Sequence, residues 1–348
     1  MEREIYPKIE ISVVIPIFNE EQIIEELTQR LESSVSEITE KFELIFVNDG
    51  SSDASLSKLI DLSNTKENVY YINLSRNFGH QKAVCAGLDH VRGKVVVVID
   101  GDLQDPPELI PKLYKKYLEG YEVVYAQRTS RKGESYFKKW SAKVFYRTLD
   151  RLTSIKIPLD TGDFRLMDRK VVDYLTKMPE QNKFLRGQIA WLGFRQTSVP
   201  FQRNERKLGE TGYPFSKMLS FALDGITGFS NVPLSLVTRA GFVISAAASL
   251  IILYAMFSHF VLGNTVTGWT SLIISFLFIG GIQLISVGVI GEYIGRIHTN
   301  TQKRPLYIVA STNCKKFKNE KRKPNLVNSN VARPINPING DLSNQLTG

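Results

Sequence analysis

The stretch from Ala240 to Gly291 contains no Asp, Glu, Lys or Arg in 52 consecutive residues. A helix needs about 20 apolar residues to cross the hydrocarbon layer of a membrane. Two such helices fit into the stretch, at about 236–259 and 269–291, with a connector of small and polar residues between them. A buried helical hairpin of a soluble protein is the alternative, but such helices carry a polar stripe and these do not. The sequence therefore predicts a transmembrane hairpin.

Basic residues indicate how this hairpin is oriented. The connector has none, whereas Lys and Arg flank both ends of the pair, at Lys217, Arg239, Arg296, Lys303 and Arg304. Short loops rich in Lys and Arg stay on the cytoplasmic side of a membrane. We therefore expect a multi-pass protein whose two termini both lie in the cytoplasm.

The net charge of +9 is concentrated at the C-terminal end of the chain. Residues 296–348 hold ten Lys and Arg against two acidic residues, a balance of +8, so the other 295 residues carry about +1. A basic tail on a near-neutral body argues against a nucleic-acid partner and favours a tail near anionic phosphates. Two cysteines, Cys85 and Cys314, exclude a disulfide framework. The N-terminus lacks the apolar core of a secretory signal, so the first domain is expected in the cytoplasm.

Residues 10–128 alternate between short β-rich runs and helix-like stretches. The runs at 44–47 and 95–99 are continuously apolar, which is typical of strands covered on both faces. This alternation predicts an α/β fold with a doubly wound, mostly parallel sheet. The expected strands are 11–16, 42–49, 69–75, 94–100 and 121–128.

Polar and acidic residues follow these strands, at the edge where the ligands of doubly wound sheets bind. Several carboxylates at one site repel each other unless a cation lies between them. No GxGxxG motif and no P-loop is present, so a bound diphosphate would need a divalent metal and basic side chains. Asp100 and Asp102, from one turn, offer the oxygen ligands that Mg²⁺ and Mn²⁺ prefer. Asp105, which precedes two prolines, is expected to cap the next helix.

Seven motifs, in order along the chain, resemble the polyprenyl-phosphate glycosyltransferases of glycosyltransferase family 2, which include bacterial undecaprenyl-phosphate glucosyltransferases and dolichol-phosphate mannose synthases. The resemblance covers about residues 10 to 310. The motifs are VVIPIFNE (13–20), VNDGSSD (47–53), SRNFGHQKA (75–83), DGDLQDPPE (100–108), GDFRLMDR (162–169), FLRGQIAWLGF (184–194) and RNERKLGETGYPFSKM (203–218).

The resemblance implies a GT-A fold and an inverting, metal-dependent enzyme of the bacterial inner membrane. Such an enzyme moves a monosaccharide from a nucleotide diphosphate sugar to polyprenyl (undecaprenyl) phosphate at the cytoplasmic face, for cell-envelope glycan or lipid modification. UDP-glucose is the favoured donor, with mannose and aminoarabinose nucleotides as open alternatives. The resemblance also makes a homotetramer plausible.

The resemblance further implies roles for individual residues. Asp163 and Asp102 are expected to be catalytic, Asp163 as a base or as an orienting group beside the acceptor. The expected nucleotide-sugar pocket consists of Pro16, Asn19, Glu20, Asp49 and Asp100. The expected ligands of Mg²⁺ or Mn²⁺ are Asp100, Asp102 and Gln104. The residues expected to bind donor or acceptor phosphates are Arg128, Arg203 and Arg206. His80 is either a donor contact or a structural histidine.

The acceptor chemistry agrees with these roles. The second pKa of a phosphate monoester is about 6, so the attacking oxygen is largely ionised at neutral pH. A strong general base is therefore less necessary than for a sugar hydroxyl. Because two anions must meet, arginines are expected to offset their repulsion.

The expected organisation has five parts. They are a catalytic domain (1–212), an amphipathic juxtamembrane helix (213–231), the transmembrane hairpin (232–295), a strand segment (296–314) and a disordered basic tail (315–348). Residues 304–309 have strand character and are a candidate to pair with a neighbouring subunit.

Two other functions stay open. A processive polysaccharide synthase carries a Gln-x-x-Arg-Trp sequence, whereas this chain has Gln188-Ile-Ala-Trp191 and one hairpin. A non-catalytic, membrane-anchored sugar-nucleotide binder would be expected to lose the acidic pair or Asp163, and both are present.

Overall fold

The computed structural model describes residues 9–129, 161–202, 230, 232–261 and 268–314. Arg203, Arg206, the tail at 315–348 and the predicted amphipathic helix, apart from Ser230, lie outside these residues.

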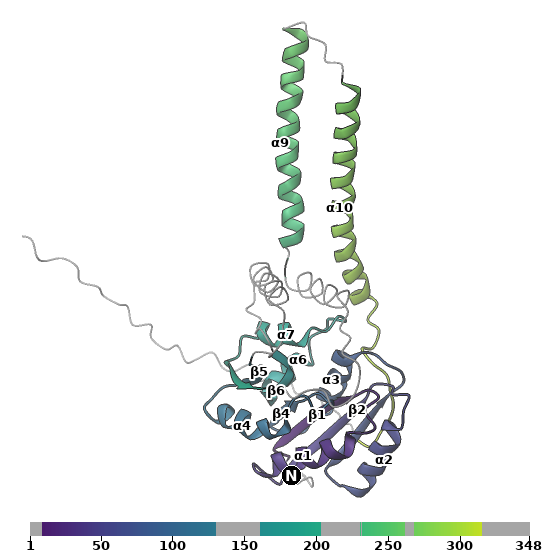
Figure 1. The fold of residues 1–348 in the computed structure, drawn as a ribbon, viewed down its shortest axis with the longest axis vertical. Coiled ribbons are helices and arrows are strands. Elements are labelled where there is room, and N and C mark those ends of the chain that lie inside the picture. Colours follow the sequence, from purple (N-terminus) through teal and green to yellow (C-terminus); the bar gives the residue numbers. More distant parts are fainter. Residues whose placement is uncertain (1–8, 130–160, 203–229, 231, 262–267, 315–348) are drawn as a thin grey trace, which may run out of the picture. The chain divides into compact units, whose positions relative to one another are not determined.

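The described residues form an eight-stranded sheet (Figure 1), in the order β7-β5-β6-β4-β1-β2-β3-β8. Four of its seven pairings are parallel and three are antiparallel. The α/β prediction is confirmed, and the five expected strands correspond to β1–β5. The strands are β1 (Ile11–Ile17), β2 (Phe42–Asn48), β3 (Val69–Leu74), β4 (Val95–Val98), β5 (Val123–Arg128), β6 (Thr161–Asp168), β7 (Gln196–Phe201) and β8 (Val309–Thr312).

Helices cover both faces of this sheet. One face carries α1 (Ile24–Ser36), α2 (Ser55–Thr65), the short 3₁₀ helix η1 (Pro107–Leu109) and α4 (Ile110–Leu118). The other face carries α3 (His80–Leu88), α6 (Arg169–Leu175) and α7 (Leu185–Trp191). All seven residues of β1 and of β2 are buried as a result, which explains their continuous apolar runs.

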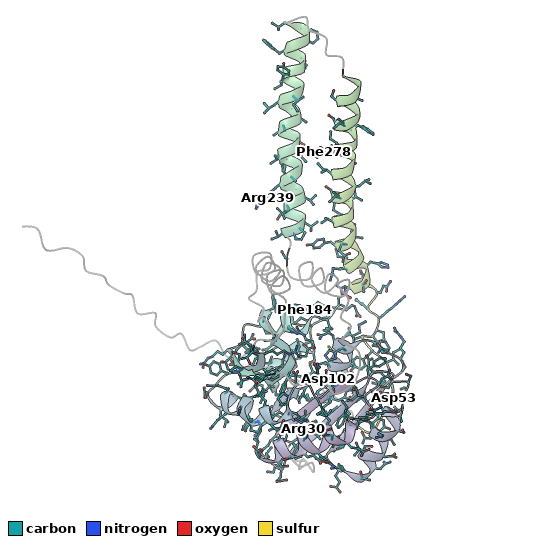
Figure 2. The ribbon with its side chains drawn as sticks, viewed as in Figure 1. Arg30, Asp53, Asp102, Phe184, Arg239 and Phe278 are labelled. Carbon is teal, nitrogen blue, oxygen red and sulfur yellow. The ribbon has the colours of Figure 1, made fainter. Side chains whose placement is uncertain are left out.

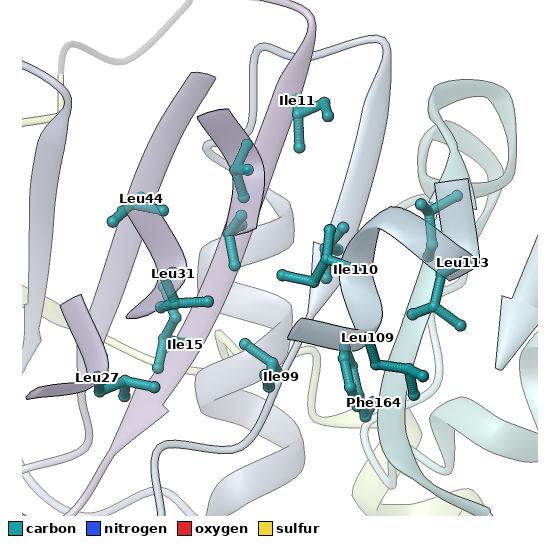
Figure 3. Packing of buried hydrophobic residues seen from close by; sticks show 14 of the residues in the cluster. Ile11, Ile15, Leu27, Leu31, Leu44, Ile99, Leu109, Ile110, Leu113 and Phe164 are labelled. Atoms are coloured by element: carbon teal, nitrogen blue, oxygen red, sulfur yellow. The ribbon is translucent and has the colours of Figure 1, made fainter. Parts of the chain in front are cut away.

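The spacing of apolar residues in α1 shows how the core is built. Ile24, Leu27, Leu31 and Val35 recur every three to four residues and are fully buried. This period places them on one side of the helix. Figure 3 shows Leu27 and Leu31 beside Ile15 of β1 in the packed interior.

Two long helices, α9 (Val232–Phe260) and α10 (Trp269–Thr301), lie side by side (Figure 1). Both are long and apolar enough to cross a membrane. Their apolar side chains are exposed rather than packed into a core; Phe278, for example, is 64% exposed (Figure 2). The alternative of a buried soluble hairpin therefore does not describe these helices. The second helix continues to Thr301, ten residues beyond the expected 291.

The chain returns to the sheet after α10. The strand β8 lies at Val309–Thr312 rather than at 304–309, and it pairs antiparallel with β3 of the same chain. The prediction of pairing with a neighbouring subunit is therefore wrong for this strand. The Ser75 N–H donates to the Ile308 carbonyl at 2.9 Å, which ties the segment to the loop after β3.

Candidate active site

The loops after β1, β2 and β4 and the start of α3 surround an open cleft of about 310 Å³. The cleft lies at the carboxyl ends of the parallel strands, as expected for this sheet type. It brings together six of the residues that the sequence singled out, namely Pro16, Glu20, Asp49, His80, Asp100 and Asp102 (Asp102 is labelled in Figure 2). Asn19 and Gln104 are not among its lining residues.

Asn19 and Asp49 hold the loops of this edge together. The Asn19 side-chain oxygen accepts a hydrogen bond from the Ser52 N–H at 2.8 Å, so it joins the loop after β1 to the loop after β2. The Asp49 carboxylate accepts from the Phe78 and Gly79 N–H groups at 2.7 and 3.0 Å. Burial raises the pKa of Asp49.

Gly50 permits the close approach of the loop at 76–79. Its φ is +68°, and a Cβ atom there would lie 2.5 Å from the backbone of Arg76 and Asn77. Only glycine fits both the left-handed conformation and this contact. Gly101, between Asp100 and Asp102, packs closely against Ile17, since a Cβ atom at Gly101 would lie 2.5 Å from Ile17 Cδ1.

Three potential metal ligands meet beside the cleft, whose lining includes His80 and Asp100 but not Asp163. One ligand atom each of His80, Asp100 and Asp163 lies within 4.8 Å of the others. Asp100 Oδ1 is buried and has no hydrogen-bond partner among the described residues; it lies 3.4 Å from His80 Nε2. Imidazole nitrogen and carboxylate oxygen both suit a divalent cation such as Mn²⁺. The residues therefore fit a metal, but the group differs from the predicted one of Asp100, Asp102 and Gln104, which stays a prediction.

Asp163 is the centre of a charged network. Its Oδ1 lies 3.0 Å from Arg186 Nε and 3.5 Å from Arg165 Nη2. Its Oδ2 lies 2.9 Å from His80 Nε2 and 2.7 Å from Gln81 Nε2. Burial opposes ionisation of this carboxyl, but Arg186, His80 and Arg165 together hold its pKa well below the usual value. Asp163 is therefore ionised and is a poor proton acceptor in this arrangement.

The partners of Asp163 remain charged at neutral pH. Burial opposes the charge on His80, but the hydrogen bond to Asp163 and the charge of Asp100 raise the pKa of His80 to about 9. Burial lowers the pKa of Arg165 to about 10, against the attraction of Asp163. Burial, followed by the charges of Asp163 and Asp102, raises the pKa of Asp100 despite the nearby His80.

Arg128, the last residue of β5, contacts Asp105 and Gly162. Its Nη2 is 3.5 Å from Asp105 Oδ1, and Asp105 is only 1% exposed. The prediction that Asp105 caps a helix is wrong, since neither η1 nor α4 has a side-chain cap. Gly162 packs on the same guanidinium, because a Cβ atom there would lie 2.7 Å from Arg128 Nη2.

Sequence reasoning missed three partners of Asp163: Gln81, Arg165 and Arg186. All three stand in the motifs that carry the family resemblance, so the motifs were a signal, but their side chains received no role. Arg165 is the most informative of them, because a charged residue in an otherwise apolar strand needs a buried partner.

The family model described as glycosyl transferase family 2 matches residues 12–176. The chain is also 51% identical over 301 residues to the uncharacterized glycosyltransferase YkcC of Bacillus subtilis, which covers 86% of this chain and 93% of that protein. The chain belongs to glycosyltransferase family 2. The family resemblance inferred from its motifs is therefore confirmed.

This family 2 glycosyltransferase is 39% identical over 301 residues to the bactoprenol glucosyl transferase of Shigella phage SfX, covering 86% of this chain and 99% of that one. A solved structure with a similar fold is glucosyl-3-phosphoglycerate synthase from Mycobacterium tuberculosis in complex with Mn²⁺, UDP and phosphoglyceric acid. That likeness has a TM-score of 0.42 and 18% identity, and covers 63% of this chain and 76% of the other.

Proposed function

We propose that this glycosyltransferase transfers glucose from UDP-glucose to undecaprenyl phosphate at the cytoplasmic face of the bacterial inner membrane. The observation that carries the proposal is the 39% identity to a bactoprenol glucosyl transferase over 99% of that protein's length. Because the alignment spans nearly all of that chain, it supports a shared donor and acceptor as well as a shared fold. The two helices that are able to cross a membrane agree with a lipid acceptor.

A divalent cation, Mg²⁺ or Mn²⁺, would bind in the cleft. Asp100 and Asp102, which line the cleft, would hold it, and the buried Asp100 Oδ1, which has no hydrogen-bond partner among the described residues, supports this. His80 would join them only after losing the proton that its pKa of about 9 retains at neutral pH, and both oxygens of Asp163 already lie within hydrogen-bond distance of other side chains. When bound, the cation would supply the positive charge that stabilises the departing diphosphate. Pro16, Glu20 and Asp49, which line the same cleft, would contact the nucleotide.

The acceptor phosphate would approach beside Asp163. An ionised phosphate oxygen attacks the anomeric carbon as the bond to the nucleoside diphosphate breaks, so no proton has to be removed from the nucleophile. Asp163, held ionised by Arg165 and Arg186, would then position these arginines rather than act as a base. Arg128, together with Arg203 and Arg206 outside the described residues, would bind phosphate oxygens.

A processive synthase is less well supported. Gln188, the first residue of the Gln-Ile-Ala-Trp sequence, is 2% exposed and donates to Glu180 Oε2 at 3.2 Å. It is not among the residues that line the cleft, and its burial leaves a growing glycan chain little access to it. Transfer of a single monosaccharide is therefore the favoured reaction.

The test uses purified full-length protein in detergent with undecaprenyl phosphate, Mg²⁺ or Mn²⁺ and a panel of labelled sugar nucleotides. We expect label from UDP-glucose in the lipid phase, and loss of that label with a chelator and in Asp102→Asn. Arg203→Ala is expected to weaken use of the lipid acceptor far more than nucleotide binding. Transfer from none of the donors would contradict the proposed reaction, and unchanged transfer in Asp102→Asn would remove Asp102 from the metal site.

A further inference from the structure

Two large aromatic side chains are exposed where α6 and α7 end. Tyr174 is 57% exposed and Trp191 is 62% exposed, while the apolar residues on the inner sides of both helices are buried in the core. Tyr and Trp combine an apolar ring with a polar group, and they are enriched where membrane and water meet. An exposed pair of this kind marks a candidate interaction surface.

Basic side chains accompany these rings. Lys177 Nζ lies 5.8 Å from the centre of the Tyr174 ring, and Tyr174 in turn packs against Phe194 at 6.1 Å. Lys170 Nζ lies 5.4 Å from the Phe194 ring. Two lysines therefore flank the ring pair of Tyr174 and Phe194, although Lys170 Nζ also lies 3.0 Å from Glu122 Oε1. This combination complements an anionic headgroup layer, in which rings lie at the interface and lysines reach phosphates.

The connection between α6 and α7 contacts the end of the second long helix. The Gln181 N–H donates to Asn300 Oδ1 at 3.0 Å, and Gln181 Nε2 donates to the Arg304 carbonyl at 2.9 Å. Exposed isoleucines continue along α10 as far as Ile297, which is 64% exposed. Asn300 comes three residues later, or about 4.5 Å along the helix axis. If α10 crosses the bilayer, Gln181 therefore lies at the depth of the lipid headgroups.

We propose that the α6–α7 surface, defined by Tyr174, Lys177 and Trp191, docks onto the headgroup layer of an anionic membrane. The inference rests on the proposed function only in that α10 spans the membrane. It has a consequence for the active site, since α7 also carries Arg186, whose Nε donates to Asp163. Arg186 and Trp191 are five residues apart, about 7.5 Å along the helix. One short helix thus reaches from the lipid surface to the charged network in the cleft.

The test measures the depth of Trp191 by fluorescence. The chain has three tryptophans, so Trp140→Phe with Trp269→Phe leaves Trp191 as the reporter in the full-length protein. The protein is placed in phosphatidylglycerol vesicles with bromine on acyl carbons near the headgroup. We expect Trp191 emission to fall about two-fold relative to unbrominated vesicles, because interfacial aromatic groups insert about 5–10 Å into the headgroup boundary.

A matched control moves the tryptophan to the face of the sheet opposite α6 and α7. In the same background, Trp191→Phe with Leu118→Trp places it on α4, where Leu118 is 67% exposed, and we expect no quenching there. Trp191→Phe with Tyr174→Trp is a second reporter of the proposed surface and is expected to be quenched. Flotation of each protein with the vesicles after alkaline carbonate extraction, which releases proteins held only at the surface, shows separately that the hairpin is inserted.

Each outcome decides the inference. Equal emission of the Trp191 reporter in brominated and plain vesicles overturns it, and protection from aqueous acrylamide without quenching by lipid points to a protein partner instead. Lys177→Ala should raise the KM for undecaprenyl phosphate about five-fold in phosphatidylglycerol vesicles, and not in phosphatidylcholine vesicles. Quenching does not require glycosyl transfer, so a protein that is quenched but transfers no sugar would contradict the proposed function alone.

Discussion

Asp163→Asn tests whether the buried carboxylate anchors its arginines or serves only as a proton acceptor. The substitution keeps the shape of the side chain and removes its charge. Arg165 is 5% exposed and lies 3.5 Å from Asp163 Oδ1. The variant therefore leaves a buried guanidinium without its carboxylate partner.

The size of the effect follows from this burial. Removing one partner of a buried ion pair costs about 3–5 kcal/mol. In a domain of about 150–250 residues, 1 kcal/mol changes the Tm by about 2–4 °C. We therefore expect Asp163→Asn to lower the Tm by about 6–20 °C and also to reduce sugar transfer. Asp102→Asn, at the partly buried cleft edge, is the matched control and should change the Tm by less than about 2 °C while transfer is lost.

The pH dependence gives a second check. A carboxyl whose pKa is depressed by folding contributes stability that is present above its unfolded pKa and lost as the pH falls through the folded pKa. The pKa of Asp163 lies well below the usual value. Burial opposes the charge on His80, but the hydrogen bond to Asp163 and the charge of Asp100 raise its pKa to about 9, so His80 adds stability that is lost as the pH rises from about 6.5 to about 9 and that Asp163→Asn largely removes. The Tm difference between the parent protein and Asp163→Asn is therefore expected to be constant between about pH 6 and pH 5, to narrow as the pH rises toward 9, and to narrow again in stronger acid.

Scanning calorimetry or intrinsic fluorescence of the purified protein in detergent measures the Tm of each variant and its dependence on pH. If Asp163 acted only as a base, Asp163→Asn would abolish transfer and leave the Tm unchanged at every pH. That result would refute the anchoring role, since no rearrangement of the network leaves Arg165 buried and unpaired without a loss of stability.

Three further predictions concern other parts of the catalytic domain. Gly50→Ala should lower the Tm more than Gly193→Ala, because both positions have positive φ but only at Gly50 does the new Cβ meet backbone at 2.5 Å; equal losses in a thermal scan would contradict this contact. Glu43→Gln breaks the buried ion pair with Arg92 and should lower the free energy of unfolding by about 3–5 kcal/mol. The KM for UDP-glucose should not change, since both residues lie at the amino ends of the strands, away from the cleft. Burial raises the pKa of Cys85 to about 12 and that of Cys314 to about 11. Maleimide should therefore label both thiols at least about 100-fold more slowly than a free cysteine, as followed by mass spectrometry. Rapid labelling of the native protein would argue against the observed packing.

The core strands were predictable because one physical signal dominates each of them. The run from Val95 to Val98 is buried along its whole length, and a short, continuously apolar run rich in β-branched residues is typical of a strand in that position. β6 was not predicted as a strand, because Asp163 and Arg165 interrupt its apolar residues. Their charges are tolerated there only because each is buried against the other, and a sequence does not show which partner a charged residue will find.

The site was predictable to the extent that neighbouring strands end at the same edge. This rule brings Glu20, Asp49 and Asp100 to one cleft. It gives no information about residues that come from later elements, and Arg186 reaches Asp163 from α7 across 23 positions of sequence. The nucleotide-binding role of Asn19 stays a prediction; its side-chain oxygen accepts from the Ser52 N–H of the next loop, a contact that the strand-end rule does not predict.

The pairing of β8 with β3 also determines the order in which the protein is completed. β3 ends at Leu74, and β8, which pairs with its outer edge, begins at Val309. The ribosome therefore adds 235 positions of chain, including both long helices, between the end of β3 and the start of β8. At about 5–20 residues per second, the ribosome needs roughly 12–47 s to cover that distance. During this interval the backbone groups on the outer edge of β3 have no strand beside them, which is a known route to aggregation. The last step in forming the sheet therefore waits until both long helices have left the ribosome.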